Sequence, residues 1–160
     1  MSDKEKTILI SGAFNPLHFG HLLLFKAASN YGKVIVALNS DEWVLRNKGH
    51  LLFDFDTRKR LLEECSYVSK VVAMDDEDND ACTALLEVKP TYFGNGGSAT
   101  SASLPKMELQ VCGYLGIEPI FNLGNFSKSI DQEKLMNAQK SIINHANKQL
   151  ENLESNLSSD

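Results

Sequence analysis

The sequence predicts an α/β fold: a parallel five-stranded sheet with helices on both faces, followed by a C-terminal helix. One observation is that short apolar runs alternate with longer segments of helical periodicity. Another is that glycine and proline stand between many of these segments. The third is size: 160 residues, 42% of them hydrophobic and 23% charged, suffice for one domain with a core.

The elements follow one another in the order expected for such a sheet. Strands are predicted at residues 7–11, 33–38, 70–74, 91–93 and 118–121, where apolar residues cluster. Helices are predicted at residues 21–30, 57–65, 81–88 and 105–114. Gly32 and Gly116 are typical helix stop signals, and Pro105 fits a helix start. In an open, Rossmann-like sheet, ligands bind outside the carboxyl ends of the strands, where the winding direction reverses.

Residues 127–157 are interpreted as a helical extension of a single domain that spans residues 1–160. Within it, an amphipathic helix over about 129–157, continuous or interrupted, is predicted by apolar residues at spacings of seven, four and three: Leu135, Ile142, Ala146, Leu150, Leu153 and Leu157. Most other positions are polar. The narrow apolar stripe therefore either packs on the domain or pairs with a second copy, giving a homodimer.

Charge and cysteine content limit the class of protein. The net charge of −5 argues against a broad surface for nucleic acid or acidic membranes. The charged N-terminus and the lack of a long apolar run lead us to expect a cytoplasmic protein without a membrane partner. Cys65, Cys82 and Cys112 lie far apart without C-x-x-C spacing, which predicts free thiols.

The segment from Ser11 to His21, S-G-A-F-N-P-L-H-F-G-H, joins the first predicted strand to the first helix. A strand that ends at a glycine and restarts as a helix presents backbone N–H groups to which phosphate can bind. Gly12 would let the main chain approach a ligand closely. His18 and His21 are three residues apart, so both lie on one side of the first helical turn. Two plain surface histidines are the simple alternative, and a zinc site lacks a third ligand nearby.

This segment matches the pattern G-x-F-x-P-x-H-x-G-H, and residues 7–124 resemble the nucleotidyltransferase superfamily, in particular glycerol-3-phosphate cytidylyltransferases and heptose-phosphate adenylyltransferases. The resemblance implies transfer of a nucleoside monophosphate from CTP or ATP to a small phosphorylated acceptor. Pyrophosphate would be released, and Mg²⁺ would be the cofactor. CMP transfer is favoured, with AMP transfer close behind.

The resemblance also implies the residues of the site. His18 and His21 would hydrogen-bond the α-phosphate, Lys48 in a flexible basic loop would touch the phosphates of both substrates, and Arg58 would help to form the site from the next helix. Arg46 would be a second basic contact. The nucleotide would further contact a set of small or hydroxyl-bearing residues and one phenylalanine: Gly12, Ala13, Phe14, Gly20, Gly96, Ser127 and Ser129.

Two departures from the family pattern keep a second hypothesis open. Ser98 stands where several relatives carry an aspartate, and Ser127 and Ser129 are the remaining hydroxyls of a serine- and threonine-rich turn. They favour a nucleotide-binding sensor or assembly subunit that has lost catalysis, whereas the intact histidine segment and Lys48 oppose it. A dinucleotide-dependent dehydrogenase is disfavoured because G-x-G-x-x-G does not follow the first strand.

The acidic run at residues 75–80 is interpreted as a solvated loop that caps the following helix, because it lacks the glycine turn and distal glutamate of a calcium loop. His50 and His145 are interpreted as ordinary surface residues.

Overall fold

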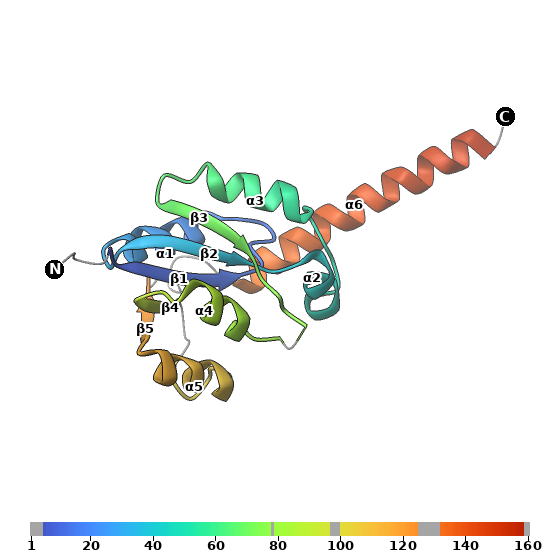
Figure 1. Cartoon of the computed structure of the whole chain (residues 1–160). Coiled ribbons are helices and arrows are strands. Elements are labelled where there is room, and N and C mark those ends of the chain that lie inside the picture. Colours follow the sequence, from blue (N-terminus) through green and yellow to red (C-terminus); the bar gives the residue numbers. More distant parts are fainter. Residues whose placement is uncertain (1–4, 78, 97–99, 125–131, 159–160) are drawn as a thin grey trace. The chain divides into compact units, whose positions relative to one another are not determined.

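The computed structural model of the chain describes residues 5–77, 79–96, 100–124 and 132–158. Its five strands are parallel and form one sheet in the order β3-β2-β1-β4-β5 (Figure 1). They are β1 (Thr7–Gly12), β2 (Lys33–Leu38), β3 (Val68–Ala73), β4 (Tyr92–Gly96) and β5 (Glu118–Leu123). The predicted fold class is therefore confirmed, and each predicted strand overlaps an observed one.

Helices connect the strands and cover both faces of the sheet. They are α1 (Phe19–Ser29), α2 (Asp41–Lys48), α3 (Phe55–Glu63), α4 (Cys82–Val88) and α5 (Lys106–Leu115). A further helix, α6 (Gln132–Ser158), follows the last strand in the chain. The chain winds from β1 outward to β3 and then crosses back to β4 on the other side of β1. Because parallel crossovers share one hand, this reversal puts α1 and α3 on one face and α4 and α5 on the other (Figure 1).

The core consists of two layers that alternate along the strands, because successive side chains of a strand point to opposite faces. One layer joins Leu9, Ala37 and Phe93 of the sheet to α4 and α5, where Leu85 and Cys112 are buried. The residues between them face α1 and α3 and are also fully or almost fully buried: Ile8, Ile10, Val34, Val36 and Leu38. The three central strands are thus apolar on both faces, as parallel sheets usually are.

Helix α2 corrects the sequence prediction, which expected a basic loop here. Ser40 caps the helix by accepting a hydrogen bond from Trp43 N at 3.0 Å. Asp41 and Glu42 lie in the first turn, and Gly49 ends the helix in the left-handed conformation at φ +78°. Val44 is the buried residue of this helix, so the apolar periodicity that would predict a helix is weak.

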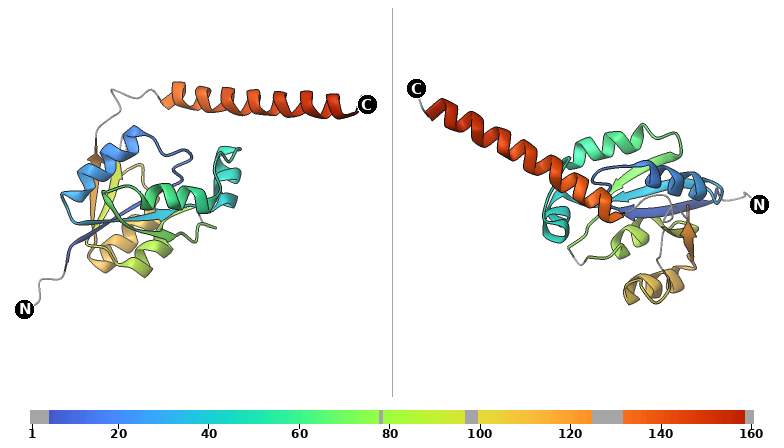
Figure 2. Two further views of the ribbon diagram at one scale, coloured as in Figure 1. Left: turned by 90° about the horizontal axis from the view of Figure 1, so that it is seen from above. Right: turned by 180° about the vertical axis from the view of Figure 1, so that it is seen from behind.

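The chain divides into two compact units, residues 1–126 and 127–160. In the second unit, α6 is one continuous helix of 27 residues, so the interruption that the sequence left open is absent (Figure 2). Among the helices that the structure describes, none combines the length and the apolar character needed to cross a membrane.

Candidate active site

The histidine segment lies at the point where the winding of the sheet reverses. β1 pairs with β2 on one side and with β4 on the other, although β4 comes much later in the chain. The segment from Ala13 to His18 leaves the carboxyl end of β1, and Gly96 ends the neighbouring strand β4. Open α/β sheets bind their ligands at such a switch point, and both the histidine segment and Gly96 lie at this edge.

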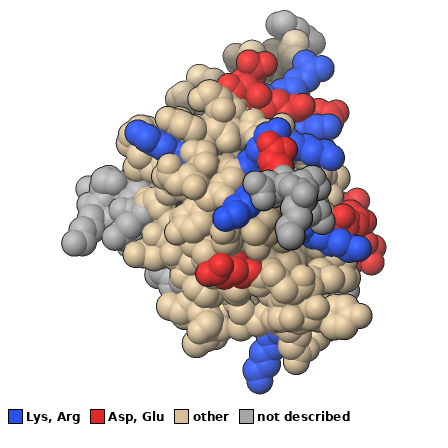
Figure 3. All heavy atoms as spheres, turned by 60° about the vertical axis from the view of Figure 1, so that its left-hand side comes forward, with Lys and Arg blue, Asp and Glu red and all other residues tan. Residues whose placement is uncertain are grey.

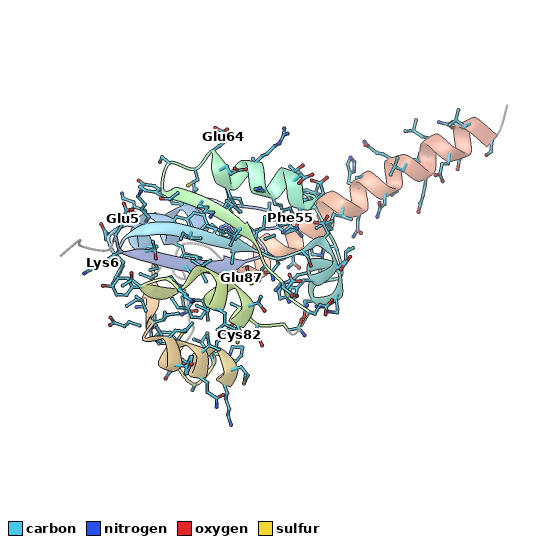
Figure 4. The ribbon with its side chains drawn as sticks, viewed as in Figure 1. Glu5, Lys6, Phe55, Glu64, Cys82 and Glu87 are labelled. Atoms are coloured by element: carbon cyan, nitrogen blue, oxygen red, sulfur yellow. The ribbon has the colours of Figure 1, made fainter. Side chains whose placement is uncertain are left out.

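A hollow of about 470 Å³ lies at the opposite edge of the sheet, where the strands begin. Its lining includes Glu5, Lys6 and Lys33, and the Lys33 ammonium is 2.9 Å from the Glu5 carboxylate. Figure 4 shows Glu5 and Lys6 at this end and Phe55, at the start of α3, toward the other end. Basic and acidic side chains are interspersed on the face shown in Figure 3. This hollow holds neither histidine, so we place the candidate site at the carboxyl edge.

The two histidines form one stacked unit at the start of α1. Their ring centroids are 3.7 Å apart with an interplanar angle of 27°. His18 is the N-cap, and its Nδ1 accepts a hydrogen bond from Gly20 N at 3.1 Å, while Nδ1 of His21 accepts one from His18 N at 3.2 Å. The expected juxtaposition of the two rings is thus confirmed. The geometry is a capping box in which imidazoles replace the usual hydroxyl and carboxylate.

These hydrogen bonds set the tautomer of each ring. A neutral imidazole whose Nδ1 accepts carries its proton on Nε2, so both histidines are Nε2–H donors. Burial lowers the pKa of His18, and burial together with the neighbouring His18 lowers the pKa of His21 to about 3. Both rings are therefore neutral hydrogen-bond donors at neutral pH. The Gly20 N–H, which we expected to face phosphate, is satisfied by the His18 ring instead.

Phe14 fixes the position of the His21 ring. Its own ring is 5% exposed, lies 4.8 Å from the His21 ring in an edge-on arrangement, and lies 5.4 Å from the Phe25 ring. A Cβ on Gly12 would come within 2.9 Å of the Phe14 ring. The absence of a side chain on Gly12 therefore makes room for the Phe14 ring, and the buried Phe14 ring packs against His21.

Arg58 is buried against the same segment. Its side chain is 1% exposed, and its Nη1 donates to the carbonyl oxygens of Ala13 at 2.8 Å and Asn39 at 3.0 Å. Its Nε donates to Phe53 O at 2.9 Å, and Nη2 pairs with the Asp41 carboxylate at 2.7 Å. Four of its five N–H groups are thus engaged within the chain. In this structure Arg58 joins β1, β2 and α3 beneath the site.

Asn15 ties the histidine segment to the loop before α3. Its side-chain oxygen accepts hydrogen bonds from Leu52 N at 2.8 Å and Phe53 N at 3.2 Å, and its amide donates to His50 O at 3.3 Å. His50, expected as an ordinary surface residue, is half-buried in this loop. The loop between α2 and α3 is therefore attached to the segment that carries the histidines.

Lys48 is the last residue of α2, not part of a flexible loop. Its side chain is exposed, and its ammonium lies 6.0 Å from the centre of the Trp43 ring, one turn earlier. The guanidinium of Arg46, the second predicted basic contact, is engaged within the chain: it donates to Asp76 O at 3.1 Å and to Asn79 Oδ1 at 3.2 Å. Both cations of α2 are exposed, but the Arg46 guanidinium is hydrogen-bonded within the chain, so Lys48 is the better candidate for a phosphate contact.

Asp76 departs from the solvated loop expected for the acidic run. It is 6% exposed, and its carboxylate accepts hydrogen bonds from Asn39 Nδ2 at 3.1 Å and from Ser40 N and Oγ at 2.7 and 2.8 Å. It thereby holds the N-cap of α2 to the end of β3. Of the same run, Asp80 accepts a hydrogen bond from Cys82 N at 3.0 Å, but it precedes the N-cap Ala81, and α4 has no side-chain cap of the kind predicted.

Of the remaining predicted site residues, the structure describes Gly96. A Cβ on Gly96 would lie 3.0 Å from a methyl group of Leu24, so this glycine lets β4 approach α1 closely. Ser98, Ser127 and Ser129 lie outside the described residues. The sequence analysis missed Asn15 and Asp76. Asn15 stood within the motif, but the partners of Asp76 are 36 and 37 residues away, and no local pattern reveals them.

The residues at the site do not form a magnesium cage. Within the described parts of the chain, no three His, Cys, Asp or Glu side chains gather as metal ligands. The groups that meet at the start of α1 are imidazole and amide donors, which suit an anion better than a hard cation that prefers oxygen ligands.

The three cysteines are free thiols: Cys112 is buried, whereas Cys65 and Cys82 are half-buried.

Comparisons with known proteins agree with the fold. A family model described as cytidylyltransferase-like matches residues 9–113, which include both histidines. The bifunctional protein HldE of Blochmanniella floridana is 36% identical over 96 residues, covering 58% of this chain and 20% of HldE. Glycerol-3-phosphate cytidylyltransferase of Bacillus subtilis is 32% identical over 68 residues, covering 42% of this chain and 53% of that protein. The chain thus spans about a fifth of the HldE proteins.

Two solved structures have folds similar to that of this chain. The lipopolysaccharide core biosynthesis protein of Thermoplasma volcanium aligns with a TM-score of 0.61 at 26% identity, covering 75% of this chain and 97% of that one. A protein of unknown function from Archaeoglobus fulgidus shares the fold alone, with a TM-score of 0.57 at 16% identity. Because the matching family model covers the sheet from β1 to α5 and the stacked histidines within it, the chain belongs to the cytidylyltransferase-like nucleotidyltransferases.

Proposed function

We propose that the protein transfers a nucleoside monophosphate from a nucleoside triphosphate to a small phosphorylated acceptor. An oxygen of the acceptor phosphate attacks the α-phosphorus, the bond to the α,β-bridging oxygen breaks, and pyrophosphate leaves with that oxygen's electron pair. The attacking oxygen is already anionic, so the step needs no general base. The contribution of the protein is positioning and charge stabilisation.

The observation that carries the proposal is the stacked pair of neutral histidines at the start of α1. Their Nδ1 atoms are both engaged by backbone N–H groups, so their Nε2–H donors are fixed in direction before a ligand binds. The positive end of the α1 dipole lies at the same place. Donors fixed in this way stabilise charge that develops on the α-phosphate and the bridging oxygen without a rearrangement during the reaction.

Lys48 supplies the mobile charge in this scheme. It stands at the end of α2, which Asp76 and Ser40 attach to the sheet. Its exposed ammonium lies beside the Trp43 ring and forms no ion pair with a carboxylate of the described residues, so it can move toward a ligand. A lysine is suited to following phosphates that move during transfer. Magnesium enters as the counter-ion of the triphosphate and so as part of the substrate, since the described residues offer no cage for it.

CTP is the proposed donor and glycerol 3-phosphate the first acceptor to test, because a relative named glycerol-3-phosphate cytidylyltransferase matches this chain. ATP remains the second donor, as the sequence motif also occurs in adenylyltransferases. Both choices rest on likeness.

The decisive experiment measures pyrophosphate release with CTP, ATP, GTP and UTP, each combined with polyol phosphates, sugar phosphates and nicotinate mononucleotide. Acceptor-dependent release with one pair, and loss of that release in His18→Asn, is the expected result. Tight triphosphate binding without release in any combination would instead support the nucleotide-binding sensor that the departures at Ser98, Ser127 and Ser129 suggested.

A further inference from the structure

The apolar stripe of α6 has a heptad spacing that the reaction does not use. With Ile143 as position a, the a and d positions of the C-terminal half of α6 are Ile143, Ala146, Leu150, Leu153 and Leu157, whereas the preceding d position is the polar Gln139. Three of these leucines are largely exposed: Leu150 at 57%, Leu153 at 58% and Leu157 at 77%. An apolar a/d repeat over two heptads is typical of a short coiled-coil seam, and large apolar side chains on such a seam need a partner.

We propose that α6 pairs with α6 of a second copy of this chain as an antiparallel two-stranded coiled coil. In an antiparallel pair, each a position forms a layer with a d position of the partner. Centred near residue 148, the register sets Ala146 against the partner's Leu150 and Ile143 against the partner's Leu153. Small residues then meet large ones. A parallel pair would instead set Ala146 against the partner's Ala146 and leave space in the seam.

Charge at the flanking positions favours the same register. Position e contains Lys140, Asn147 and Glu154. In the antiparallel pair, e positions face e positions, so Lys140 lies opposite the partner's Glu154 twice, and Asn147 lies opposite the partner's Asn147. In a parallel pair, position e faces position g, and Glu154 would face the partner's Gln149 without an opposite charge. Sequence complementarity thus selects a second copy in one orientation.

The other occupants of the stripe fit less well. A helix that lies on an acidic membrane carries a strongly basic polar face. Residues 137–158 contain two lysines, Lys140 and Lys148, and two glutamates, Glu151 and Glu154, so this stretch has no net positive charge from them. Packing on unit 1 would bury the apolar stripe. It would not explain why Lys140 and Glu154, which lie opposite each other in the antiparallel pair, have opposite charges.

The first test is the mass of the full chain by sedimentation velocity over a range of concentrations. We expect a dimer that becomes a monomer in the double variant Leu150→Glu, Leu153→Glu. Glutamate is a good helix former, so the substitution removes the seam while it keeps helix propensity. A wild-type chain that stays monomeric at about 200 μM, a concentration well above a micromolar Kd, would overturn the proposal, as would a dimer that survives both substitutions.

The second test concerns orientation and does not depend on disrupting the seam. Lys140→Glu sets a glutamate opposite the partner's Glu154, and Glu154→Lys sets two lysines together, so each should weaken the dimer by roughly threefold to thirtyfold in Kd. The double variant Lys140→Glu, Glu154→Lys should restore it. Double-swap dimers as weak as the single variants would exclude the antiparallel register.

Matched controls come from the outer face of the same helix. Lys148 and Glu151 occupy positions f and b, which point away from the seam in either orientation. Lys148→Glu, Glu151→Lys and their double variant change the net charge in the same way and should leave Kd unchanged. Co-sedimentation of the chain with vesicles of phosphatidylcholine and phosphatidylglycerol at 3:1 should be absent; binding that removes the dimer from solution would assign the stripe to a lipid surface instead.

Discussion

At the scale of single residues, the two nitrogens of each imidazole ring at the site have different roles. Nδ1 of His18 caps α1 and Nδ1 of His21 completes the capping box, while the opposite nitrogen of each ring is the donor proposed for phosphate. A substitution at either residue therefore changes helix capping and chemistry together. The two effects can be separated only by a side chain that keeps one of them.

His18→Asn is such a side chain, since asparagine is a favoured N-cap whose oxygen can accept from Gly20 N but which has no Nε2–H. We expect kcat to fall by about 10² to 10³ in His18→Asn and His18→Ala alike, by analogy with the loss of one oxyanion donor. The free energy of unfolding should fall by about 1 kcal/mol only in His18→Ala, which loses the cap. Steady-state kinetics and urea unfolding report the two effects. Normal turnover in His18→Asn would contradict the proposed role.

The lowered pKa of His21 predicts a pH dependence of stability. In the folded chain the pKa is about 3, against an ordinary value of 6.5. Between about pH 6.5 and pH 3, His21 is protonated in the unfolded chain but neutral in the folded chain. Protonation therefore favours unfolding in this range, so the free energy of unfolding falls as the pH decreases below about 6.5 and does not depend on His21 above it. The slope for one proton is at most about 1.4 kcal/mol per pH unit.

Urea unfolding of the wild type and of His21→Gln between about pH 7 and pH 4 measures this contribution directly. The glutamine side chain does not titrate in this range, so the variant should lose stability less steeply with falling pH. Parallel curves for the two proteins would show that His21 is not held neutral by burial.

At the scale of elements, the strands were predictable because their signal is local. Each of the five apolar runs overlaps an observed strand, and residues 33–38 agree in both bounds. Helix α2 was not predictable from apolar periodicity, because it buries Val44 and otherwise faces outward. Its capping residues, Ser40 before it and Gly49 after it, were the signal that could have revealed it.

The contacts of Arg58 show why part of the site could not be predicted. Its acceptors Ala13 O and Asn39 O are 45 and 19 residues away, and they become neighbours only when β1 and β2 pair. The sequence could suggest a basic residue near the phosphates. It could not show that a buried guanidinium would be directed toward carbonyl groups of the chain.

Arg58→Lys tests whether this residue positions the segment or binds phosphate directly. One ammonium cannot reach the carbonyls of Ala13, Asn39 and Phe53 together, so buried acceptors lose their donors. We expect a loss of about 2–4 kcal/mol in the free energy of unfolding and a fall in kcat. Arg60→Lys, at an exposed position of the same helix, is the control and should change stability by less than about 0.5 kcal/mol. Unchanged stability with a raised KM for the triphosphate would indicate direct phosphate binding.

At the scale of the whole molecule, the chain has two units whose stability has different sources. The sheet and its helices bury a two-layered core, whereas α6 exposes Leu150, Leu153 and Leu157 and contains many asparagines and serines, which are moderate helix formers. An isolated helix of this kind is marginal in water. Its stability must come from whatever covers the stripe.

Pairing with a second copy makes that stability depend on concentration, because mass action favours the dimer. We expect thermal unfolding, followed by circular dichroism at about 222 nm, to show a helical transition. If α6 pairs in a dimer, the midpoint of this transition should be several degrees higher at about 200 μM than at about 2 μM. A transition of unit 1 that is seen separately should keep its midpoint. In Leu150→Glu, Leu153→Glu the concentration dependence should disappear. A helical transition with the same midpoint at both concentrations would mean that α6 is stabilised within its own chain, because only an intramolecular contact is independent of the number of molecules present.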